Sequence, residues 1–130
     1  MSSKPHQKSY ALEERLISFA VRIVRLASDL PKDFAGQYFG KQVLRSGSSP
    51  ALNYGEARSA ESKKDFRHKC SIVLKELRET HINLRIIHQS GIYESELLAD
   101  IIDENNQLIS IFVATIRSVD EGLNKSARTK

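Results

Sequence analysis

The chain of 130 residues contains one cysteine, no tryptophan and few other aromatic residues. A single thiol cannot form an internal disulfide, and Cys70 alone cannot hold a structural zinc ion. No apolar run approaches the ~18 residues that a membrane-spanning helix needs. The polar N-terminus also lacks the apolar stretch of a secretory signal. These absences predict a cytoplasmic protein that does not enter the membrane.

The alternation of apolar and polar residues that is typical of strands is also missing. Apolar residues instead recur every three or four positions and predict four helices, over about 9–30, 34–60, 62–90 and 94–123. Because the connections are short, neighbouring helices should run antiparallel. The sequence therefore predicts an all-α, up-down-up-down four-helix bundle over 10–123. The segments 1–9 and 124–130 are expected to be flexible, the latter as a basic tail.

Several residues mark the ends of these helices. Ser9 is a suitable N-cap for the first helix, and Pro31 stops it. Ser62 should cap the third helix, with the carboxylate of Asp65 in its first turn. Gly91 is expected to end that helix in the left-handed conformation that favours glycine.

The second helix has the weakest helix-forming sequence. It contains four glycines, each of which costs up to ~1 kcal/mol relative to alanine. Pro50 removes a backbone donor from its middle, so a kink or a break is predicted between Gly47 and Pro50. In the case of a break, Ser49 could cap a restarted helix.

Charge is unevenly distributed along the chain. The net charge is +4, yet the five charged residues between Tyr93 and Leu108 are all acidic. Such asymmetry suits an anionic partner or charge-complementary packing between copies, and ordinary solvated charge explains it equally well.

Basic residues gather around the turn between the second and third helices and are the candidate nucleic-acid ligands. These candidates are Arg58, Lys63, Lys64, Arg67 and Lys69 around the turn, together with Lys41 further back on the second helix. Few aromatic residues accompany them, so any binding should depend on charge and shape rather than on base stacking. The alternative is that these residues are ordinary solvent-exposed charges without a binding role.

No catalytic pattern is present. The closest approach to a di-iron motif is Asp65-x-x-His68, which has no second copy. Cys70 lies on an apolar stripe and should be a buried hydrophobe. No glycine-rich phosphate loop occurs. The sequence thus predicts no enzyme, no cofactor and no metal ligand, and a metal-binding bundle is the least favoured alternative.

A set of polar residues in the second and third helices has a structural explanation. Its members are Arg45, Ser46, Asn53, Glu56 and Glu79. Buried polar groups must be paired, and such networks fix the register between helices or subunits. We expect Arg45 to pair with Glu56 or Glu79 across the bundle.

Four short motifs carry a family resemblance. They are Leu44-Arg45-Ser46-Gly47-Ser48-Ser49, Asn53-Tyr54-x-Glu56-Ala57, Ser62-Lys63-Lys64-Asp65-Phe66 and Lys75-Glu76-x-x-Glu79-Thr80. Together they resemble the S23 type of four-helix bundle proteins, which are encoded in intervening sequences of bacterial 23S ribosomal RNA genes. The resemblance implies a homo-oligomer, typically a pentamer, without known catalysis.

A related protein, the accessory variability determinant of diversity-generating retroelements, binds nucleic acid and a reverse transcriptase. The resemblance therefore implies RNA, DNA or a protein such as a reverse transcriptase as partner. The interpretation that follows is a non-enzymatic homo-oligomeric module that binds or scaffolds RNA or a ribonucleoprotein. The alternative is a protein-protein adaptor without affinity for nucleic acid.

Overall fold

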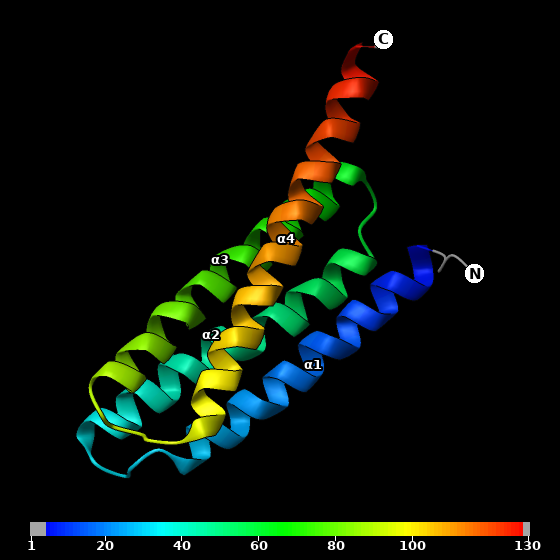
Figure 1. Ribbon diagram of the computed structural model, residues 1–130. Helices are drawn as coiled ribbons and strands as arrows, with labels where there is room; N and C mark the ends of the chain where they lie inside the picture. The colour runs from blue at the N-terminus through cyan, green and yellow to red at the C-terminus, as the bar shows by residue number, and fades with distance from the viewer. Residues whose placement is uncertain (1–4, 129–130) are drawn as a thin grey trace.

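Four helices make up the computed structural model, which describes residues 5–128 (Figure 1). They are α1 (Pro5–Asp29), α2 (Phe34–Arg58), α3 (Lys63–Gln89) and α4 (Glu96–Arg128). Each helix runs antiparallel to the next, and α1–α2, α2–α3 and α3–α4 pack closely. The described residues contain no strand, which confirms the all-α prediction. No helix among them is long and apolar enough to span a bilayer.

The caps predicted for the third helix are present, whereas the N-cap predicted at Ser9 is wrong because that residue lies inside α1. The amide N of Asp65 donates to the Ser62 side chain at 3.0 Å, at the start of α3. Gly91 follows the end of α3 with φ +74°. The N-cap of α2 was not predicted: Asp33 Oδ1 accepts a hydrogen bond from the Gly36 amide at 2.8 Å.

Two helices are longer than predicted. α1 begins at Pro5 rather than near Ser9, since proline lacks only an amide that the first turn of a helix leaves unpaired. α4 continues beyond 123 to Arg128, and the cations of its last turn, Lys125 and Arg128, complement the helix dipole. The segments predicted to be flexible are thus helical over 5–9 and 124–128; the remainder, 1–4 and 129–130, lies outside the described residues.

Helix α2 is continuous through Pro50, so the predicted restart at Ser49 is wrong. The backbone hydrogen bond to the Ser46 carbonyl is missing because proline has no amide hydrogen. Burial of both residues between the neighbouring helices holds the backbone in place despite that loss. A kink without a break stays a prediction.

The core fills the space between the helices with aliphatic side chains and three aromatic rings, those of Phe19, Tyr54 and Phe112. Phe112 of α4 meets Tyr54 of α2 edge to face, with ring centroids 5.4 Å apart. Gly47 lets α2 approach α1, because a Cβ at this position would lie 2.8 Å from Ile23. The chain therefore uses glycine in α2 for close helix packing, at a cost in intrinsic helix stability.

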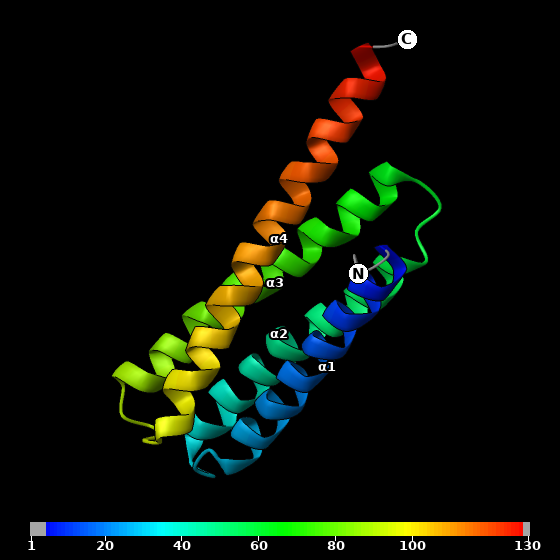
Figure 2. The ribbon, with the colours of Figure 1, turned by 45° about the vertical axis from the view of Figure 1, so that its right-hand side comes forward.

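Helix α1 contacts α4 sparsely, and the two helices separate towards the end that holds the α4 C-terminus (Figure 2). One ion pair joins them: the Arg15 guanidinium donates to both carboxylate oxygens of Glu104, at 2.7 and 2.8 Å. Gln107 accepts a further hydrogen bond from the same guanidinium. This polar clamp holds the α1–α4 side of the bundle near its middle.

The clamp makes stability depend on pH. Hydrogen bonds from Arg15 lower the pKa of Glu104 below its usual value. A lowered folded-state pKa adds stability above the unfolded value of about 4.3, and this stability is lost as pH falls through the folded pKa. Glu104→Gln should therefore lower the free energy of unfolding by about 1 kcal/mol at pH 7 and by much less near pH 3.

Urea titrations at the two pH values measure this difference. Asp100→Asn, which changes an exposed acid of the same helix, is the matched control and should show no such dependence. A Glu104→Gln effect of equal size at both pH values would contradict the ion-pair explanation.

Candidate nucleic-acid interface

Three of the six predicted nucleic-acid ligands already form ion pairs with carboxylates of the same chain. Arg58 donates to Glu13 at 2.6 Å. Lys69 lies 3.4 Å from a Glu56 oxygen. Arg67 holds both oxygens of Asp120, and this contact raises the pKa of Arg67 and lowers that of Asp120. These three cations join helices to one another and are less available to phosphates.

The other three predicted ligands do not form one surface. Lys41, Lys63 and Lys64 are exposed and make no ion pair within residues 5–128. Lys41 lies on α2, whereas Lys63 and Lys64 begin α3. The structure therefore does not bring the six predicted residues together.

A different row of basic residues lies along the outer face of α3, and we call it the α3 basic stripe. Its members are Lys64, His68, Lys75, Arg78 and Arg85. All are exposed, and the described part of the chain offers none of their four Lys and Arg side chains an ion pair. Steps of 3, 4 and 7 residues keep them on one side of the helix. The stripe spans 21 residues, or about 32 Å at 1.5 Å per residue.

The surroundings of the stripe favour anions. Glu79, the acid nearest to it on α3, is held by Arg45 of α2. Arg117 of α4 lines the same shallow groove as Arg78. Of the two acids in that groove, Asp120 is engaged by Arg67 and Glu121 is exposed. The positive field along α3 is therefore only partly offset.

The stripe contains no Phe, Tyr or Trp side chain, and the imidazole of His68 is its one ring on which a base could stack. The exposed aromatic side chains are Tyr10 on α1 and Phe34 and Tyr38 on α2. Ile82 and Ile86 are the exposed apolar residues of α3. Contacts from the stripe would thus reach phosphates and sugars, which carry little sequence information.

Sequence reasoning grouped cations by their proximity along the chain and so missed Lys75, Arg78 and Arg85. The helical spacing that identified the apolar face of α3 would also have placed them in one row with Lys64. The pairing of Arg67 with Asp120 gave no such signal, since 53 residues separate the partners.

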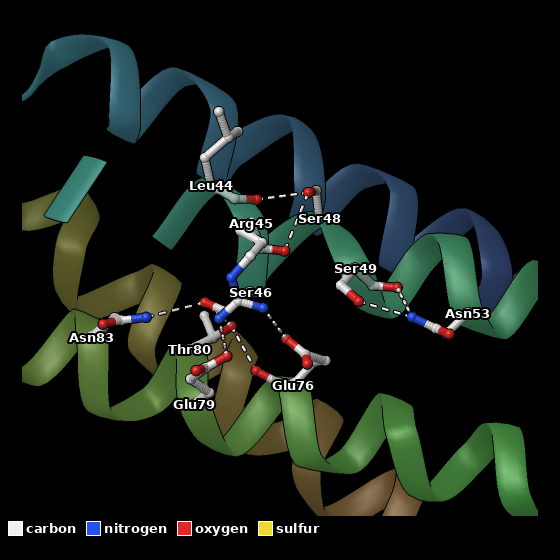
Figure 3. Close-up of polar contacts among 10 residues, drawn as sticks. All are labelled: Leu44, Arg45, Ser46, Ser48, Ser49, Asn53, Glu76, Glu79, Thr80 and Asn83. Carbon is white, nitrogen blue, oxygen red and sulfur yellow. Dashed lines mark hydrogen bonds and ion pairs between the residues drawn. The ribbon is translucent and has the colours of Figure 1, made fainter. Parts of the chain in front are cut away.

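The polar set is divided between the surface and the interior (Figure 3). Arg45 donates to Glu79 and, at 3.1 Å, to Glu76; the hydrogen bond with Glu79 is the main cause of its raised pKa. The predicted pairing with Glu79 is therefore present. Glu56 instead meets Lys69, and Asn53 bonds only to Ser49 of its own helix. These groups are partly exposed, so each contributes little to stability.

A buried hydrogen-bond network lies beside these surface contacts. Thr80 donates to Ser46 Oγ at 2.9 Å, and Asn83 Nδ2 donates to the same oxygen at 3.2 Å. Figure 3 shows the three side chains between α2 and α3. Asn83 was missed because a lone asparagine in a helix gives no sign of its partner. The network fixes the register of α2 against α3.

The side chains that could hold a metal ion or act as a nucleophile are few and scattered in the described part of the chain. The described residues contain no group of three or more side chains of the His, Cys, Asp and Glu types that could share a metal ion. Asp65 and His68 lie in the first turns of α3 without further ligands. Burial raises the pKa of the Cys70 thiol to about 12, so this group stays protonated and is a poor nucleophile.

Comparisons with known proteins give two matches. The family described as 23S rRNA-intervening sequence protein matches residues 8–114. A crystal structure of a protein of unknown function from the S23 ribosomal protein family of Bacteroides thetaiotaomicron VPI-5482 is 31% identical, with a TM-score of 0.78. The alignment covers 85% of this chain and 98% of that one. Curated proteins provide no match.

Proposed function

Because the chain belongs to the family of 23S rRNA-intervening sequence proteins, we propose that it is a non-enzymatic, self-associating module of the cytoplasm that binds RNA. The α3 basic stripe is the observation that supports RNA binding. Four lysine and arginine side chains on one straight face, free of internal carboxylates, suit a run of phosphates. The lack of Phe, Tyr and Trp in the stripe favours duplex or structured RNA, which proteins recognise by shape and backbone.

Salt dependence gives the first expected result. Four phosphate contacts predict a log–log slope of about −3 for the association constant. Affinity for a structured RNA should therefore fall by roughly 50- to 150-fold between 50 and 200 mM salt. A salt titration with a labelled hairpin RNA measures the slope.

The double variant Lys75→Gln/Arg85→Gln removes two of the four contacts. We expect the slope to become shallower by about 1.5 to 2 and the affinity at low salt to fall by about tenfold or more. Both residues are exposed, so the thermal midpoint should hardly change.

Lys32→Gln/Lys41→Gln removes the same net charge from exposed positions outside the stripe and serves as the control. Its slope should stay at the wild-type value. Equal losses in the two variants would show that general charge, rather than the stripe, governs binding.

Exposed apolar residues support a second candidate, a protein-protein adaptor. Phe34 is 94% exposed and Leu52 70% exposed, both on α2. Aromatic residues such as Phe34 are enriched at the centres of protein–protein interfaces. Wild-type protein without measurable affinity for RNA at 50 mM salt would favour this function over RNA binding.

A further inference from the structure

The side of the bundle between α1 and α4 stays open beyond the Arg15–Glu104 clamp. The first turns of α1 diverge from α4 there (Figures 1 and 2). A groove of about 750 Å³ lies between the two helices, and we define it as the α1–α4 groove. Its volume is within the roughly 300–1,000 Å³ that is usual for binding clefts.

The floor of the α1–α4 groove is largely apolar. Leu12 of α1, Phe66 of α3 and Ile111 of α4 line it and are partly buried against the core. The remaining lining of α4 consists of short side chains, which leave room for a ligand: Ala114, Thr115, Ser118 and Val119.

A second depression lengthens the α1–α4 groove. It has a volume of about 470 Å³, shares Phe66, Ser118 and Val119 with the groove, and extends along α4 to Gly122. The stretch of α4 from Ile111 to Gly122 covers about 17 Å at 1.5 Å per residue, or about three turns of a helix. The combined groove therefore has the length of a short helical segment rather than of a small molecule.

Tyr54 supplies a polar group to this apolar groove. It lines the groove although it is only 3% exposed, and its ring packs on Phe112. Its hydroxyl forms no hydrogen bond within residues 5–128, whereas buried tyrosine hydroxyls usually have a partner. Burial raises the pKa of Tyr54, so the hydroxyl stays protonated and can donate to an oxygen atom of a ligand.

The rim of the combined groove is basic. Lys8 of α1 and Lys63 of α3 are exposed and make no ion pair with the described part of the chain. Among the described residues, Glu61 is the only acid that lines either depression. A ligand with an apolar surface and acidic flanks therefore fits best. RNA does not fit, because its phosphates would lose water against an apolar floor.

We propose that the α1–α4 groove binds an amphipathic helix of another protein, with its apolar stripe on Phe66 and Ile111 and its acidic flanks towards Lys8 and Lys63. Helices that bind in grooves do so through apolar residues spaced three and four apart. A side-chain oxygen of the bound helix accepts the hydrogen bond from Tyr54. This inference is independent of RNA binding and of self-association.

A model peptide tests the groove directly. The probe is a fluorescently labelled peptide of about 15 residues, built on alanine, with leucine along one stripe and glutamate on both flanks. Anisotropy titration with the full chain should show saturable binding with a dissociation constant below about 100 µM. The same peptide with lysine in place of glutamate should bind about tenfold more weakly.

Two substitutions place the peptide in the groove. Tyr54→Phe removes the hydroxyl but keeps the ring against Phe112, and should weaken binding by about tenfold without lowering the thermal midpoint. Ala114→Glu puts an acid on the exposed floor and should weaken binding by about tenfold or more.

Matched controls use the same chemical changes outside the groove. Tyr93→Phe and Ala99→Glu alter a loop residue and an exposed residue near the start of α4. Both should bind the peptide as wild type does. Circular dichroism melting checks that every variant is folded.

The outcomes separate this inference from the proposed function. No saturable binding of the glutamate peptide up to about 1 mM, or equal losses in the groove variants and their controls, would overturn it. A changed assembly mass of Ala114→Glu in analytical ultracentrifugation would show that another copy occupies the groove and would also overturn it. RNA affinity should be the same for wild type and Ala114→Glu, so a failure of the RNA proposal leaves the groove result intact.

Discussion

Phe112→Ala should lower the free energy of unfolding by about 3–5 kcal/mol. The Phe112 ring is fully buried in the middle of α4, and its edge-to-face contact with Tyr54 joins α4 to α2. Alanine removes the transfer free energy of the ring, and the helices around it cannot fully close the cavity. For a chain of this length, the thermal midpoint should fall by about 10–20 °C.

Phe34→Ala provides the control for this loss. The substitution is chemically the same, but Phe34 is 94% exposed at the start of α2. Its effect should stay within about 0.5 kcal/mol. Thermal and urea unfolding of the two variants measure the difference, and similar losses would contradict the position of Phe112 in the core.

Gly36→Ala should destabilise the fold by about 3 kcal/mol or more. A Cβ on Gly36 would lie 2.0 Å from the carbonyl oxygen of Pro31 and 2.8 Å from its carbonyl carbon. Both atoms belong to the backbone, so the loop between α1 and α2 would have to move. Such a movement also disturbs the Asp33 cap, which holds the Gly36 amide.

Gly122→Ala should have the opposite effect. Gly122 lies inside α4, and a Cβ there would meet nothing within 4 Å. Alanine should raise the free energy of unfolding by about 0.5–1 kcal/mol, because it is the better helix former and restricts the unfolded chain. Chemical unfolding of both glycine variants measures whether each substitution raises or lowers the free energy of unfolding. A loss of stability in both variants would contradict this account.

The helices were predictable because their signals are local. Apolar residues at helical spacing defined all four, and Ser62 and Gly91 marked the ends of α3. The continuity of α2 through Pro50 was not predictable, since helices packed on either side override a local preference. The extension of α4 was missed for the opposite reason: its last turn is polar and lacks the apolar period on which the prediction relied.

The candidate site was only partly predictable because the availability of a cation depends on partners that are distant in sequence. Arg58 pairs with Glu13, which is 45 residues away in the sequence, and Arg67 pairs with Asp120, which is 53 residues away. Sequence alone cannot reveal such pairs. Of the six predicted residues, only Lys64 belongs to the α3 basic stripe, and the other members of the stripe lie further along α3.

The sparse contact between α1 and α4 has a consequence for how the chain opens. Beyond the Arg15–Glu104 clamp, the first turns of α1 rest mainly on α2, where Arg58 binds Glu13 and lies over the Tyr10 ring. This stretch can detach while α2, α3 and α4 keep their mutual packing. The amide hydrogens of these first turns would then exchange with solvent through local fraying, well before the rest of the bundle unfolds cooperatively.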